Sequence, residues 1–110
     1  MRTFPIFVIL YNVWFSFKSG SDEIAEIAKT RHFLNDLKSR QKLHGYRLMK
    51  NRTQPEKTKL PPYQLMAEFA DSDQFAQPFA EVGKIGLHSG KHGAMIENVE
   101  EFKVEVFEDL

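Results

Sequence analysis

Residues 63–69, YQLMAEF, decide the fold because apolar and polar side chains alternate through them without a break. One set consists of Tyr63, Leu65, Ala67 and Phe69, and the other of Gln64, Met66 and Glu68. Successive side chains of a β-strand point to opposite faces of a sheet. The alternation therefore predicts a strand with one buried face. Pro61 and Pro62 precede it, at the start of a strand, where missing amide hydrogens are tolerated.

Working outward from this strand, the chain shows three further strand patterns. Aromatic and β-branched residues fill 4–17, and alternation marks 46–51 and 100–108. In the last of these, Phe102, Val104 and Val106 oppose charged neighbours. The polar segment 52–59 is predicted to be a loop.

Two segments have the spacing of helices. The first is predicted from a cap at Ser21 to about Leu43, with a packed face made of Ile24, Ile27, Leu34 and Leu37. The second begins at Asp71 and should kink or restart at Pro78, because proline in a helix interior removes a hydrogen bond. Residues 86–93 are predicted to form a glycine-rich loop, which a short turn at 94–96 can follow.

The order of these elements predicts an α+β fold, a ferredoxin-like βαββαβ sandwich whose antiparallel sheet carries two helices on one face. The 110 residues suit a single domain over 1–110. The other face should carry Asn12, Trp14, Arg47, Met49, Gln64, Met66 and Glu68. That set is too apolar for open water and too polar for a plain core. We therefore expect a second copy to cover it and to leave a partly polar cavity. A bulge in the first strand would reverse the facing of Asn12 and Trp14.

Several short runs support this fold by resemblance. They are 11–15 (YNVWF), 20–22 (GSD), 45–49 (GYRLM) and 86–88 (GLH). Together they resemble a group of small bacterial proteins of unknown function in the dimeric α+β barrel superfamily, over nearly the whole chain. The resemblance implies a homodimer that forms a dimeric α/β barrel. Asn12 and Gln64 stand where the group's pattern has histidines, so a histidine pair serving as ligands or bases would be lost here.

Composition excludes several classes of function. Fifteen basic residues balance fifteen acidic ones, so the chain has no net positive charge to attract nucleic acid. There is no cysteine for a disulfide, a thiolate nucleophile or a cysteine-type zinc site. The apolar run from Phe4 is too short to span a membrane and lacks a cleavage site for export. We expect a cytoplasmic protein with neither a nucleic-acid nor a membrane partner.

The candidate ligand pocket consists of Asn12, Trp14, Arg47, Gln64 and Glu68, with His88 at its mouth. His88 is the candidate catalytic residue, because imidazole exchanges protons near neutral pH. His88 and His92 have the spacing of two metal ligands on a helix, but the surrounding glycines favour a surface loop, so no metal and no cofactor are predicted. The amides of 86–93 with Lys91 could instead bind a small anion.

Three function classes fit these residues. The first is a homodimer that binds a small molecule between its sheets. The second is a cofactor-independent monooxygenase or an isomerase, and the third is a non-catalytic structural or regulatory dimer. Haem-degrading relatives need a histidine ligand on the helix side of the pocket, whereas His32 is predicted to face water.

Overall fold

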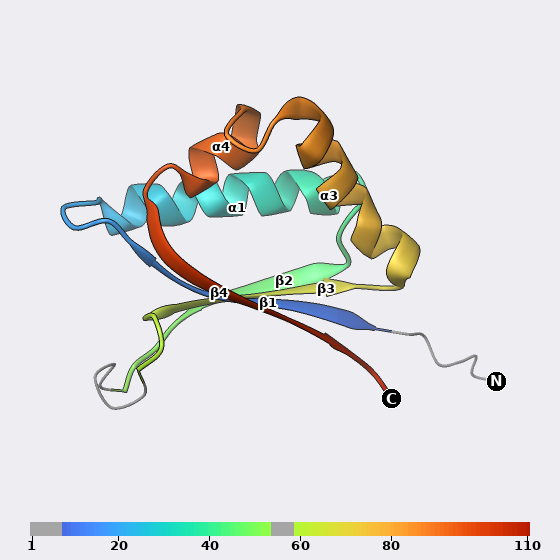
Figure 1. The fold of residues 1–110 in the computed structure, drawn as a ribbon, viewed down its shortest axis with the longest axis horizontal. Helices are drawn as coiled ribbons and strands as arrows, with labels where there is room; N and C mark the ends of the chain where they lie inside the picture. Colours follow the sequence, from blue (N-terminus) through green and yellow to red (C-terminus); the bar gives the residue numbers. More distant parts are fainter. Residues whose placement is uncertain (1–7, 54–58) are drawn as a thin grey trace.

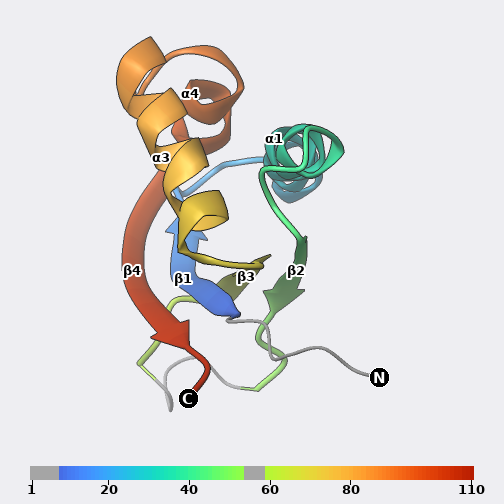
Figure 2. The same ribbon diagram turned by 90° about the vertical axis from the view of Figure 1, so that its right-hand side faces the viewer.

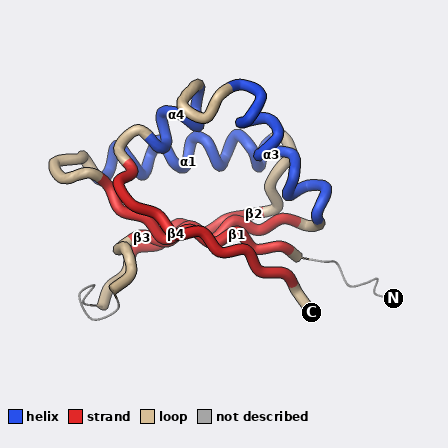
Figure 3. Tube along the Cα trace, viewed as in Figure 1, coloured by secondary structure: helices blue, strands red, loops and turns tan. Residues whose placement is uncertain are grey.

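The computed structural model describes residues 8–53 and 59–110. Within them the elements are β1 (Ile9–Phe17), α1 (Glu23–Ser39), β2 (Gly45–Lys50), β3 (Tyr63–Phe69), α3 (Ser72–Ile85), α4 (Gly90–Ile96) and β4 (Val99–Glu108). The helices lie together on one side of the sheet, and no helix covers the other side (Figures 1 and 3). Residues 4–7 of the predicted first strand and 54–58 of the predicted loop lie outside the described residues.

The four strands form one antiparallel sheet in the order β2-β3-β1-β4. Both crossovers, through α1 and through α3 with α4, run over the same face, which confirms the ferredoxin-like prediction. β1 and β3 are central, while β2 and β4 form the two edges (Figure 2). Val13 on β1 lies between Leu65 on β3 and Val104 on β4.

The predicted facing of β1 is confirmed. Asn12 pairs with Met66, and Trp14 pairs with Gln64, so both β1 residues lie on the face away from the helices. An irregularity is present in the pairing with β4, but only between Phe15 and Phe17. This irregularity comes after Asn12 and Trp14 in the chain, so it does not change the face to which they point.

The core lies between α1 and the central strands. It comprises Ile9, Phe15, Leu34, Leu37, Leu43, Leu65, Ala67 and Phe69. Full burial of one such large side chain stabilises the fold by about 1.5–3 kcal/mol, so this layer supplies most of the driving force that holds the helices on the sheet.

The first helix differs from the sequence prediction at both ends. Asp22, not Ser21, is the cap, and its carboxylate accepts a hydrogen bond from the Ala25 amide at 3.3 Å. The helix ends at Ser39 rather than near Leu43, because Gln41 adopts a positive φ of 60° that no helix can continue.

The packed face of α1 also differs. Ile24 is 81% exposed, whereas Glu26 and Thr30 are buried with Leu34 and Leu37. Both residues are hydrogen-bonded: Thr30 donates to the Glu26 carbonyl at 3.1 Å, and Asn98 donates to Glu26 Oε2 at 2.9 Å. Glu26 Oε1 is buried without a partner among the described residues.

The second helical region begins as predicted, because Asp71 caps α3 by accepting from the Gln74 amide at 2.8 Å. α3 continues through Pro78 without restarting. The segment predicted as a loop ends in a third helix, α4, which contains Gly90 and Gly93. A Cβ on Gly93 would overlap the His88 backbone carbonyl. Gly93 is therefore needed for a close backbone approach, and it does not interrupt the helix.

Along β4 the facing was predicted correctly, but the burial was not. Phe102, Val104 and Val106 lie in register with the helix-facing residues of β1. They remain 66%, 42% and 53% exposed. The strand is at the sheet edge, beyond the cover that α1 gives to β1 and β3.

Candidate functional site

Side chains from three strands meet on the face that no helix covers. In register, Asn12 of β1 lies beside Met66 of β3 and Glu105 of β4. Trp14 lies beside Gln64 in the next row. The sheet therefore brings together three residues of the predicted pocket, namely Asn12, Trp14 and Gln64.

These side chains form a continuous hydrogen-bond network. The Gln64 amide donates to Asn12 Oδ1 at 2.7 Å, and Asn12 Nδ2 donates to Glu105 Oε1 at 3.0 Å. Trp14 Nε1 donates to the same Glu105 oxygen at 3.1 Å. Asn12 is only 5% exposed although no helix covers it. The network fixes the orientation of both amides and of the indole ring.

Glu105 is the member of the network that the sequence prediction missed. It was grouped with Glu101 and Lys103 as a charged residue alternating with apolar neighbours. A signal for it does exist, because the predicted fold places the last strand beside the first. Antiparallel pairing then puts a carboxylate of β4 next to Asn12.

A hollow of about 450 Å³ opens beside this network. Trp14 and Gln64 belong to the network and also line the hollow, so the network forms part of its wall. The other lining residues are Met49, Lys50, Asn51, Arg52, Thr53, Leu60 and Pro62. The hollow thus combines an aromatic ring and a thioether with amide groups and two cations.

The two cations differ in their partners. The ammonium of Lys50 lies 2.7 Å from Glu23 Oε2, and the Tyr63 hydroxyl also donates to this carboxylate. These hydrogen bonds lower the pKa of Glu23. Burial, followed by the adjacent Glu23, raises the pKa of Tyr63 to about 12. Arg52 is exposed and has no ion pair with any other described residue.

Arg47 and Glu68 share this face but stand apart from the network. Arg47 is in register with Met66, and Glu68 with Gly45. Glu68 lies 3.5 Å from His44 Nε2 and has no ion pair with Arg47. Neither residue lines the hollow. They belong to the periphery of the open face.

His88 is not brought to the open face within one chain. It lies in the connection between α3 and α4, in the helix layer on the opposite side of the sheet (Figure 1). Its role as an acid or base stays a prediction. His92 belongs to α4, where its Nδ1 lies 2.7 Å from the Leu87 carbonyl. Within 8–53 and 59–110, no three acidic or histidine side chains are grouped to hold a metal ion.

Solved structures with the same fold include a protein of Arabidopsis thaliana, At3g17210, with a TM-score of 0.72 and 10% identity over 93% of this chain and 95% of that one. A dimeric ferredoxin-like protein of unknown function from Jannaschia sp. CCS1 has a TM-score of 0.63 and 16% identity over 91% and 97%. A dabb family protein with a ferredoxin-like fold from Mesorhizobium loti has a TM-score of 0.53 and 18% identity over 94% and 98%. At these identities the likeness establishes the fold.

At the level of sequence, residues 8–110 match the model of a family described as a family of unknown function (DUF6614). Comparison with curated proteins found no match. Among the helices of the described residues, none combines the length and the apolar character that crossing a membrane requires.

Proposed function

This chain belongs to the DUF6614 family of unknown function, and we propose that it forms a homodimer through its open sheet face and binds a small molecule there. The observation that carries the proposal is the network of Gln64, Asn12, Glu105 and Trp14. A fixed polar network on a face that also holds Met49 and Met66 suits a covered, partly polar cavity better than open water.

The two edges of the sheet support pairing of two copies. β4 carries Glu100, Glu101, Glu105 and Glu108 against one lysine, whereas β2 carries Arg47 and Lys50 and no acid. In a dimer whose facing sheets are related by a two-fold axis parallel to the strands, the acidic edge of each copy meets the basic edge of its partner. The structural neighbour from Jannaschia sp. CCS1 is itself described as dimeric.

The chemistry of the hollow indicates what kind of ligand it would hold. Trp14 and Met49 offer apolar surface for a flat ring. Arg52 offers donors for an acidic or other accepting group. The ligand we propose therefore has an aromatic or other apolar body and one acidic group.

Binding fits this set of side chains better than catalysis. Side-chain amides and an indole do not ionise near neutral pH. Glu105 is therefore the single titratable group of the network, and its Oε1 already accepts two hydrogen bonds. No observation favours the monooxygenase or the isomerase. The cytoplasmic location stays a prediction from composition.

Sedimentation equilibrium tests the dimer. The chain should show twice its mass of 12.8 kDa. Met66→Arg, which places a charge at the centre of the open face, should return it to the single mass with an unchanged circular dichroism spectrum. Ala28→Arg, on the exposed surface of α1, is the control and should leave the dimer intact. A wild-type protein that is monomeric at about 100 micromolar, a concentration far above the Kd of a stable dimer, would contradict the proposal.

Fluorescence tests the ligand site, because Trp14 is the only tryptophan. The test ligand is 8-anilinonaphthalene-1-sulfonate, an aromatic sulfonate. It should quench Trp14, and both Arg52→Gln and Gln64→Ala should weaken its binding while the dimer persists. Gln77→Ala removes an exposed amide on α3 and should have no effect. Equal binding by all four proteins would argue against this site.

A further inference from the structure

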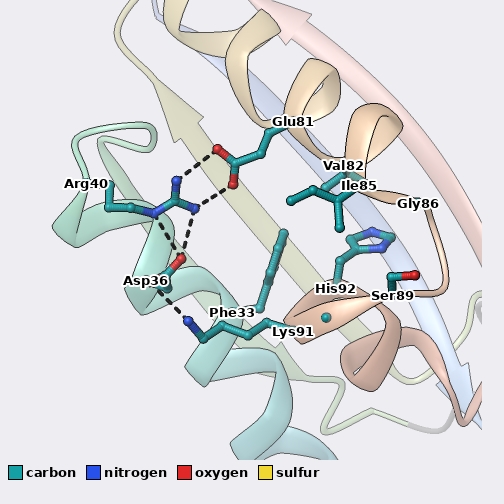
Figure 4. A pocket seen from close by; sticks show the side chains of 11 residues that line it. Phe33, Asp36, Arg40, Glu81, Val82, Ile85, Gly86, Ser89, Lys91 and His92 are labelled. Atoms are coloured by element: carbon teal, nitrogen blue, oxygen red, sulfur yellow. Dashed lines mark hydrogen bonds and ion pairs between the residues drawn. The ribbon is translucent and has the colours of Figure 1, made fainter.

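A second hollow, of about 400 Å³, lies in the helix layer between α1, α3 and α4 (Figure 4). It is on the opposite side of the sheet from the network described above. Its walls are Phe33 of α1, Val82 and Ile85 of α3, and His92 of α4. Ile85 is 62% exposed, so apolar surface is available there for a bound molecule to cover.

The charged side chains at the rim of this hollow are already paired. Arg40 binds Glu81 through two hydrogen bonds of 2.8 and 2.7 Å and also contacts Asp36 at 2.9 Å. Lys91 reaches Asp36 at 3.4 Å. The hydrogen bonds from Arg40 lower the pKa of Glu81, which keeps this carboxylate ionised. Two cations balance two anions, so the rim selects for neither charge, and an uncharged ligand fits best.

His92 supplies a hydrogen-bond acceptor in the wall. A carbonyl oxygen can only accept, so the 2.7 Å contact with the Leu87 carbonyl places a proton on Nδ1. In the neutral ring, Nε2 then carries the lone pair, and it has no partner among the described residues. The ring is held in place edge-on to Phe33, with centroids 5.3 Å apart.

We propose that this hollow binds a small, uncharged, planar aromatic molecule with one N–H or O–H donor. The donor bonds to His92 Nε2, and the ring of the ligand lies against Phe33, Val82 and Ile85. This site is independent of the dimer and of the sheet-face ligand, because it shares no residue with either.

The matched test ligands are indole and 1-methylindole, which differ in the N–H donor. Titration is followed by amide chemical shifts at pH 8. Indole should shift amides around Phe33, Val82 and His92. 1-Methylindole should bind about three- to tenfold more weakly, the effect of one neutral hydrogen bond. Equal affinities, or shifts centred on Trp14, would overturn the proposal.

Two variants distinguish the contribution of the apolar wall to binding from that of the His92 acceptor. His92→Phe retains an aromatic ring beside Phe33 but removes Nε2, so indole should bind no better than 1-methylindole. Ile85→Ser removes apolar surface at an exposed position and should weaken both compounds without affecting the fold. Ile24→Ser, at an exposed isoleucine near the start of α1 that does not line the hollow, is the control and should bind like wild type. If Ile85→Ser also binds like wild type, the hollow is not the site.

Discussion

The two strands that flank β1 have the same pattern but different surroundings. Leu65 of β3 and Val104 of β4 both lie opposite Val13 and both face the helix side. Leu65 is 8% exposed and packs beneath α1, whereas Val104 is 42% exposed at the sheet edge. Alternation thus determines which way a side chain faces, and position in the sheet determines whether it is covered. A long edge strand with exposed apolar side chains on one face is a surface on which another chain can pair.

The largest effect expected from this comparison is at Leu65. Leu65→Ala should lower the free energy of unfolding by about 2–5 kcal/mol, because it leaves a cavity in the core. Val104→Ala, in register across Val13, should cost less than about 1 kcal/mol when measured below the concentration at which the dimer dissociates. Urea denaturation at low protein concentration measures both. Equal losses would show that β4 is covered within one chain.

Two polar residues on the open face of β1, Asn12 and Ser16, provide the next comparison. Asn12→Ala should cost about 1–3 kcal/mol, because it removes the partner of the Gln64 amide and one of the donors to Glu105. Ser16→Ala is the control on the same face, since its exposed 3.4 Å hydrogen bond to Glu101 contributes little. Thermal unfolding of the two variants distinguishes a structural network from a loose set of polar side chains. A cost near zero for Asn12→Ala would mean that the network is not formed.

A smaller effect on stability, which depends on pH, is expected at Tyr63, the first residue of β3. Unfolded Tyr63 loses its proton near its ordinary pKa of 10.0, whereas folded Tyr63 retains it until about pH 12. Raising the pH through this window therefore favours the unfolded chain. Tyr63→Phe should lose less stability than wild type between pH 10 and 12. The variant should still lose some stability as the pH rises, because burial also raises the pKa of Tyr11. If wild type and Tyr63→Phe lose stability equally over this pH range, Tyr63 is not the group responsible.

The smallest effect is expected in the helix layer, where Arg40 joins α1 to α3. Arg40→Ala breaks the paired contact with Glu81 and the contact with Asp36. All three side chains are partly exposed, so the loss should be no more than about 1 kcal/mol and should shrink in high salt. Glu81→Ala should give a similar value. A loss above about 2 kcal/mol would show that this cluster, rather than the apolar core, holds α3 in place.

The sequence could predict what depends on strand period and strand order. The facing of Leu65, Asn12 and Gln64 follows from alternation, and the position of Glu105 follows from pairing the last strand with the first. It could not predict features set by distant contacts. α4 was missed because Gly93 is needed for its approach to the His88 carbonyl.

The packed face of α1 was likewise set by a distant residue. Glu26 is stabilised in its buried position by Asn98, far along the chain, and not by its helical neighbours alone. Helical spacing instead favoured Ile24, which lies on the exposed side of the helix.

The most direct test of the homodimer is an isotope-filtered nuclear Overhauser experiment on a mixture of labelled and unlabelled chains. With methionine methyl groups labelled in one copy, Met66 and Met49 should show contacts to protons of unlabelled Trp14 in the other copy. Such contacts would place two open faces against each other, as the network and the charged edges predict. The account would be contradicted if contacts between copies involve only side chains of the helix layer, such as Ile24 and Ile85, or if none are present.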